Sequence, residues 1–144
     1  MAARESSAVQ SLRSAYGREF LFGHWQRLED AFAVGLPDVN VHLPGVGDLW
    51  IEVKNVPPER MPKRTTTPVK PGLRPEQVIW LYKAKAAGRK VCVLIRLPSL
   101  WVWYARDFEY INDRNIHDLI NGATFTSPKL VLSEAFAAVV RDDS

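Results

Sequence analysis

Residues 48–55 read DLWIEVKN, and in the second half of this stretch apolar side chains alternate with Glu52 and Lys54. Neighbouring side chains on a β-strand point to opposite faces, so a strand here places Glu52 and Lys54 on one face and the apolar side chains in the core. The stretch therefore predicts a strand with one buried face and one face that carries chemically active groups.

A second alternating stretch, residues 38–43, lies just upstream and begins with Asp38 of the sequence GLPD. The turn sequence PGVG at residues 44–47 joins the two stretches, which predicts a hairpin whose polar face carries both Asp38 and Glu52. Two converging carboxylates beside a lysine are unfavourable in water alone. They suit a divalent cation held between the acids while the lysine faces a reacting water. The pattern indicates metal-dependent hydrolysis of a phosphodiester.

The rest of the chain alternates between helical and strand-like patterns. Helices are expected over residues 6–16, 75–87 and 115–120 and at the end of 130–140, and strands over 25–29, 91–97 and 100–104. Gly17 is the expected stop of the first helix, while Pro75 and Gly88 fit the start and end of the second. This alternation predicts an α/β fold with a central mixed sheet flanked by helices.

Composition predicts one soluble domain over residues 1–144. The chain is 47% hydrophobic with a formal net charge of +3, enough apolar content for a single core. No apolar run is long enough to cross a bilayer, and residues 1–10 are polar rather than signal-like. The only cysteine, Cys92, lies in an apolar run and is expected in the core. We expect a cytoplasmic protein without a membrane partner.

Basic residues and prolines are concentrated between the predicted hairpin and the second helix. Prolines at this density exclude helix and central strand, so a long surface loop is expected. A basic loop directly after the Glu52 strand suits a DNA backbone that passes the site, although a solvated, flexible insert has the same composition. The basic residues of this loop, expected to bind DNA, are Arg60, Lys63, Arg64, Lys70 and Arg74.

The chain resembles the PD-(D/E)XK nuclease superfamily, and within it the stand-alone VRR-NUC type of bacteria and their viruses. The matching segments are residues 25–29, 35–39, 50–54, 74–81, 88 and 91–96. Pro-Asp or Glu-x-Lys alone is common in proteins. The combination is specific, because the two motifs occur in order on a predicted hairpin and are followed by a helix that carries a glutamine. The resemblance covers about residues 5–97 and implies a restriction-endonuclease-like core.

The resemblance also implies a metal site. Asp38 and Glu52 would hold Mg²⁺ or Mn²⁺, with the backbone carbonyl of Val53 as a third oxygen ligand, and oxygen donors without histidine suit these ions. Members of the family carry a further metal-binding glutamate on the first helix. Glu5 is the best match for it in this sequence, with Glu19 as the alternative.

Two further side chains would act on the reacting groups. Lys54 would orient or help to deprotonate the attacking water and offset the charge that develops on the phosphate. Gln77, from the second helix, would position Lys54 or a metal-bound water.

Stand-alone members of this type are associated with homodimers that cut branched DNA such as Holliday junctions. Paired cuts across a junction need two active sites related by a two-fold axis, and the apolar segment 98–144 could supply the dimer contact as an accessory part of the domain. Flaps, nicks or linear duplex are alternative targets for a nuclease of this fold. A DNA-binding module without catalytic activity is the alternative from a different class.

Overall fold

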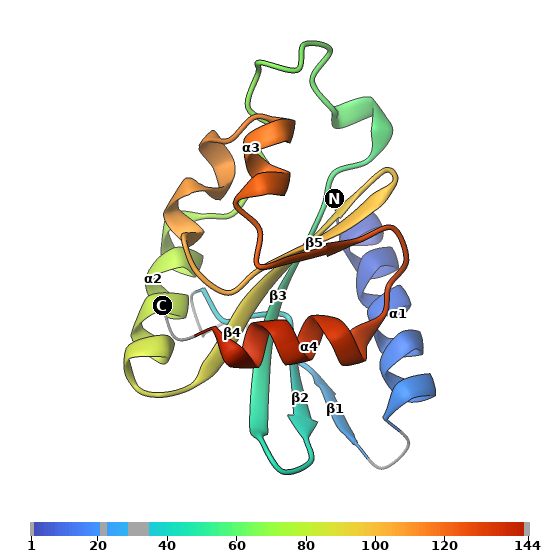
Figure 1. Ribbon diagram of the computed structural model, residues 1–144, viewed down its shortest axis with the longest axis vertical. Coiled ribbons are helices and arrows are strands. Elements are labelled where there is room, and N and C mark those ends of the chain that lie inside the picture. The colour runs from blue at the N-terminus through green and yellow to red at the C-terminus, as the bar shows by residue number, and fades with distance from the viewer. Residues whose placement is uncertain (1, 21–22, 29–34, 143–144) are drawn as a thin grey trace.

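The computed structural model describes residues 2–20, 23–28 and 35–142, with side chains described from Ser7 onward. In these residues six strands form one sheet in the order β1-β2-β3-β4-β5-β6 (Figure 1). The strands are β1 (His24–Arg27), β2 (Val39–Leu43), β3 (Gly47–Asn55), β4 (Lys90–Leu97), β5 (Leu100–Tyr104) and β6 (Phe125–Ser127). Strands β3 and β4 pair in parallel and all other neighbours pair antiparallel. The sheet is therefore mixed, as predicted.

Helices cover both faces of the sheet. The helices are α1 (Ala2–Glu19), α2 (Pro75–Ala86), α3 (Ile116–Asn121) and α4 (Leu132–Arg141), with short 3-10 helices η1 (Pro58–Arg60) and η2 (Phe108–Asp113). Helices α1 and α4 pack on one face, and α2, η2 and α3 contribute to the core on the other. The α/β class is confirmed, and the arrangement is consistent with a restriction-endonuclease-like core.

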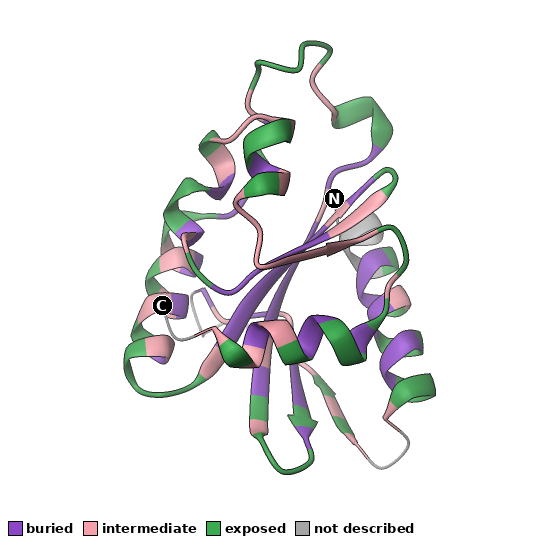
Figure 2. Ribbon diagram, in the orientation of Figure 1, coloured by how far each residue is buried: buried purple, intermediate pink, exposed green. Residues whose placement is uncertain are grey.

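Alternation along β3 divides its side chains between the two cores. Leu49, Ile51 and Val53 are fully buried against α1 and α4, whereas Trp50 packs with the cluster under α2. Glu52 and Lys54, two and four residues after Trp50, therefore lie on the α2 side. The buried centre of the sheet is visible as the purple strands of Figure 2. This division places the side chains of Glu52 and Lys54 beneath the first turn of α2.

The first helix is longer than predicted. Gly17 does not end it, because α1 continues to Glu19 and the amide of Phe20 still donates to the carbonyl of Tyr16 at 2.8 Å. The carboxylate of Glu19 accepts from the backbone amides of Leu132 and Ser133 at 2.9 to 3.1 Å. Glu19 thus caps the N-terminus of α4, a tertiary contact that favours the extra turn.

The C-terminal segment supplies much of the core. In β5 the side chains of Val102, Trp103 and Tyr104 are at most 1% exposed, and Phe136 and Val139 of α4 are also buried. These apolar residues, which suggested a dimer contact, are thus covered within the chain itself, because α4 packs on one face of β5 and η2 and α3 pack on the other. A dimer contact in this segment would have to use its remaining exposed surface. None of the described helices combines the length and apolar character needed to span a membrane.

The basic loop has a defined path. Val69 and Leu73 are buried, and the amide of Val69 donates to the carbonyl of Arg114 at 3.0 Å. The side-chain oxygen of Asn112, in η2, accepts from the amides of Gly72 and Leu73, each at 3.1 Å. The C-terminal third therefore anchors the return of the loop into α2, a contact that composition alone did not indicate.

Candidate active site

The hairpin and α2 bring together Asp38, Glu52, Lys54 and Gln77. Glu52, Lys54 and Gln77 are 2%, 5% and 4% exposed, while Asp38, just before β2, is half-buried. The antiparallel register pairs Val39 with Ile51, so Asp38 lies beside the carboxyl end of β3, where Glu52 and Lys54 stand. The site is therefore at the carboxyl end of β3, between the hairpin and the first turn of α2.

Glu52 is the centre of the contacts in this site. Its Oε2 lies 3.4 Å from the Lys54 Nζ and accepts a hydrogen bond from the Gln77 Nε2 at 3.0 Å. Gln77 therefore positions Glu52 directly, whereas the resemblance implied a contact to Lys54 or a water.

The orientation of the Gln77 amide follows from its two partners. Its Oε1 accepts from the backbone amide of Arg74 at 2.9 Å, so its Nε2 faces Glu52. A carboxylate accepts and does not donate, so this is the orientation that satisfies both groups. The same bond to Arg74 closes the N-terminus of α2, where an unpaired amide needs an acceptor. Gln77 thus ties the start of α2 to Glu52.

Asp38 is held through the backbone of β3. Its Oδ2 accepts from the amide of Val53 at 2.9 Å. The N–H and C=O of one strand residue point to the same edge, so the Val53 carbonyl also faces the side of β3 on which Asp38 lies. The Val53 carbonyl thus has the orientation that the ligand role implied by the resemblance requires, and the role itself stays a prediction.

The carboxylate of Glu52 lacks a full set of hydrogen bonds and is disfavoured in its charged form. Its Oε1 is buried and has no hydrogen-bond partner in the part of the chain that the structure describes. Burial and then the neighbouring negative charge of Asp38 raise the pKa of Glu52 well above its ordinary value, while Lys54 acts in the opposite direction. A carboxylate in this position gains from a cation, which would supply the missing partner and offset the charge of Asp38.

The donor set fits a hard divalent cation in part. Asp38, Glu52 and the Val53 carbonyl offer only oxygen, as Mg²⁺ and Mn²⁺ prefer. Among the described residues, no three His, Cys, Asp or Glu side chains gather closely enough to hold a metal. Glu5 lies in the first turns of α1, but its side chain is outside the described part of the chain. The alternative, Glu19, is bound to the N-terminus of α4 and is therefore not a ligand of this site.

Gly35 is a residue that the sequence motif contains but whose importance was missed. Its φ is +82°, and a Cβ there would lie 2.3 Å from the carbonyl oxygen of Glu76 and 3.2 Å from the amide nitrogen of Gln77. Only glycine allows so close an approach of backbone to backbone. Gly35 thus lets the segment that leads to Asp38 pack against the first turn of α2. A glycine three residues before the aspartate is the signal that could have indicated this contact.

The basic residues of the loop all lie on the surface. The Arg60 guanidinium donates to the carbonyls of Asn55 and Lys70 at 3.2 and 3.4 Å, so it braces the loop against the end of β3. Arg74 forms an exposed ion pair with Glu76 at 3.5 Å. Lys63 and Arg64 are exposed in the outer part of the loop. The structure thus gives Arg60 and Arg74 structural contacts in addition to the DNA contacts predicted for them.

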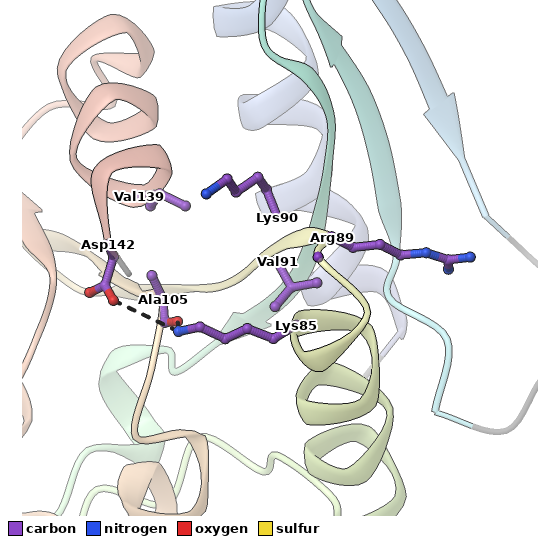
Figure 3. Close-up of a pocket in the computed structure, with 8 residues that line it drawn as sticks. Lys85, Arg89, Lys90, Val91, Ala105, Val139 and Asp142 are labelled. Carbon is purple, nitrogen blue, oxygen red and sulfur yellow. Dashed lines mark hydrogen bonds and ion pairs between the residues drawn. The ribbon is translucent and has the colours of Figure 1, made fainter. Parts of the chain in front are cut away.

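A pocket of about 160 Å³ lined by basic residues lies at the start of β4, at the end of the sheet opposite the candidate active site (Figure 3). Its Lys85 donates to the carbonyl of Ala105 at 2.6 Å and lies 3.7 Å from a carboxylate oxygen of Asp142. Arg89 points away from this pocket and lies 5.5 Å from the centre of the Trp50 ring. The charges of Lys85 and Asp142 therefore offset each other, and this pocket joins the end of the chain to the core.

Comparison with known proteins leaves the family open. No family model matches the chain, and no curated protein matches it. Among solved structures, the chain is similar to Hjc, a Holliday junction resolvase from Archaeoglobus fulgidus, with 19% identity and a TM-score of 0.43. The similarity covers 73% of this chain and 74% of that chain. At such a TM-score the likeness establishes neither family nor activity, and the function proposed below rests on the geometry of the site.

Proposed function

We propose that this protein is a metal-dependent endonuclease that hydrolyses DNA phosphodiester bonds at the site formed by Asp38, Glu52, Lys54 and Gln77. One observation carries the proposal: among the described residues, the buried Glu52 has an oxygen without a hydrogen-bond partner, beside a second carboxylate and a lysine. A structural ion pair would need only one acid and would leave no buried oxygen unsatisfied. The order of these residues on a hairpin and a following helix is also that of the PD-(D/E)XK resemblance.

Asp38, Glu52 and the carbonyl of Val53 would hold Mg²⁺ or Mn²⁺, with Glu5 as a further ligand. When bound, the cation would offset phosphate charge and lower the pKa of a coordinated water. The residues of the chain do the rest. Gln77 keeps the Glu52 carboxylate in one orientation, and the amide of Val53 does the same for Asp38. The ammonium of Lys54 donates hydrogen bonds to the attacking water or to the phosphate oxygens as negative charge develops there.

Branched DNA is the substrate class that we propose, with junction resolution by a homodimer as its most demanding form. The supporting observation is the exposed basic loop. Its basic side chains would recognise the charge and shape of the DNA backbone, and the loop offers no element of the kind that reads bases in the major groove. Flaps, nicks and linear duplex are the alternative targets within the same chemistry. DNA binding without cleavage is the alternative of a different class.

The test is cleavage of four end-labelled substrates by the purified protein, each with Mg²⁺ and with EDTA. The substrates are a four-way junction, a flap, a nicked duplex and an intact duplex of matched sequence. Metal-dependent paired cuts in the junction support the full proposal. Equal cutting of all four supports the nuclease and refutes the preference for branches. Binding without cutting in either condition refutes the nuclease and favours the DNA-binding module.

A further inference from the structure

Two tryptophans lie on the same face of the sheet as the candidate active site. Trp50 is two residues before Glu52 on β3, so alternation places both side chains on the α2 side. Trp80 is three residues after Gln77 on α2, which is about one helical turn. Two residues on a strand span about 7 Å, so the contact between the two indole rings lies one step along the face from the hydrogen bond that joins Gln77 to Glu52.

The two rings leave part of their surface open. The ring centres of Trp50 and Trp80 are 5.3 Å apart and the ring planes are inclined by 55°, so neither ring covers the face of the other. Each side chain packs against the core cluster under α2 and is half-buried, so part of it still faces solvent. Every nucleic-acid base has a flat π-face that can stack on such a ring, and this stacking does not depend on base sequence.

A guanidinium adjoins this aromatic surface. Arg89 is exposed, and its guanidinium lies 5.5 Å from the centre of the Trp50 ring. Its side chain points away from the pocket that Figure 3 shows. In the part of the chain that the structure describes, Arg89 forms no ion pair with an acid. A guanidinium that lies over an aromatic ring and has no carboxylate partner keeps its donors for another anion, and its planar fork matches a phosphate.

The opposite face of the sheet carries a comparable pair of side chains. The guanidinium of Arg96 lies 5.3 Å from the centre of the Trp101 ring, and Trp101 packs against the core cluster under α1. Among the described residues, the Trp50 pair differs from it in two respects. It shares a face with Glu52, and a second indole ring, that of Trp80, adjoins it. The pair on the α1 face is therefore an internal control for the pair on the α2 face.

From this arrangement we propose that Trp50, Trp80 and Arg89 bind one unpaired base of the DNA and its phosphate. The indole ring of Trp80 stacks on the base, and the guanidinium of Arg89 binds the phosphate. The inference rests on the proposed function and deepens it, because it names the part of a branched substrate that the protein recognises. A base in intact duplex has to be unstacked and unpaired first, whereas a base at a flap or an open branch point is already free.

The test measures equilibrium binding by fluorescence anisotropy in EDTA, where metal-dependent cleavage is absent. The two probes are labelled single strands of about ten nucleotides, one of oligothymidine and one abasic, which differ only in the presence of bases. Trp80→Leu removes the proposed stacking ring, whereas Trp80→Phe retains an aromatic ring. Trp101→Leu is the matched control, because Trp101 is also half-buried beside an arginine. Arg89→Gln and Arg96→Gln form the corresponding pair for the phosphate contact.

The wild type should bind oligothymidine about tenfold more tightly than the abasic strand, the size expected for stacking of one base. Trp80→Leu should reduce this preference to within about twofold, while Trp80→Phe and Trp101→Leu keep it and all three remain folded by circular dichroism. Arg89→Gln should weaken the binding of both strands by about tenfold, the size expected for hydrogen bonds to a charged group, and Arg96→Gln should not.

A full preference for bases in folded Trp80→Leu overturns the stacking site, and so does an equal loss of preference in Trp80→Leu and Trp101→Leu. If Trp80→Leu does not fold, the exposed Arg89 decides: binding by Arg89→Gln that is as tight as binding by Arg96→Gln overturns the site. Metal-dependent cutting of branched DNA by a wild type without a preference for bases also overturns the site, but leaves the nuclease intact. Failure of the wild type to bind or cut any DNA overturns both proposals.

Discussion

Replacement of Gly35 by alanine tests how the segment before Asp38 meets α2. The φ of +82° costs an L-residue about 1–2 kcal/mol. The added Cβ would also lie 2.3 Å from the carbonyl oxygen of Glu76, a backbone atom that cannot turn aside. Relief of such overpacking costs about 1–3 kcal/mol more. We therefore expect Gly35→Ala to lower the free energy of unfolding by about 2–5 kcal/mol.

Gly45 provides the matched control. Its φ of +79° is nearly the same, but a Cβ there would meet nothing within 4 Å. Gly45→Ala should therefore show only the backbone cost of about 1–2 kcal/mol in urea unfolding. The excess in Gly35→Ala measures the contact with α2. Because that contact adjoins Gln77, DNA cleavage should also fall in Gly35→Ala and persist in Gly45→Ala. Equal destabilisation by the two substitutions, with equal cleavage, would refute this account of the motif.

Three further outcomes are expected. Replacing Lys63 and Arg64 together by glutamine should reduce the slope of log binding constant against log salt concentration by about 2, measured by anisotropy. Cleavage at saturating DNA, measured on gels, should change little. An unchanged slope would mean that the DNA does not contact these two residues. Glu19→Ala should lower the free energy of unfolding by about 1 kcal/mol, because α4 loses its N-terminal cap, and should leave cleavage intact. Loss of cleavage in a folded Glu19→Ala variant would instead indicate that Glu19 belongs to the active site. The raised pKa of Glu52 means that, above the ordinary pKa of 4.5, the folded state retains a proton that the unfolded state has lost. Without metal, the free energy of unfolding of the wild type should therefore fall relative to that of Glu52→Gln as the pH rises above 4.5. Unfolding in urea with EDTA at several pH values measures this difference, which added Mg²⁺ should reduce; a constant difference across pH would contradict it.

The hairpin and α2 were predictable because their signals are local. Alternation in residues 48–55 assigns Glu52 and Lys54 to one face, and the pairing of β2 with β3 agrees with the predicted turn at residues 44–47. Proline and glycine at the ends of α2 are likewise local signals. Asp38, Glu52, Lys54 and Gln77 meet in the structure as the resemblance implied, while their roles in catalysis remain predictions.

The features that were missed depend on residues far apart in the chain. Gly35 meets Glu76 across 41 positions, and Asn112 holds Gly72 and Leu73 across about 40. No periodic pattern encodes such contacts, and η2 and β6 are too short to produce one. For the same reason the sequence predicted a long surface loop but not its path, and it assigned the apolar C-terminal third to a possible dimer contact.

The most direct test of the central claim is the single-turnover cleavage rate of branched DNA with Mg²⁺ for the wild type, Lys54→Ala and Lys83→Ala. Lys83 is exposed on α2 and serves as the control for loss of a lysine. If Lys54 acts on the attacking water or the phosphate, Lys54→Ala should be slower by about 100-fold or more, with DNA binding and fold retained. Lys83→Ala should match the wild type. Wild-type cleavage by a folded Lys54→Ala would show that the centre formed by Asp38, Glu52 and Lys54 does not carry the reaction.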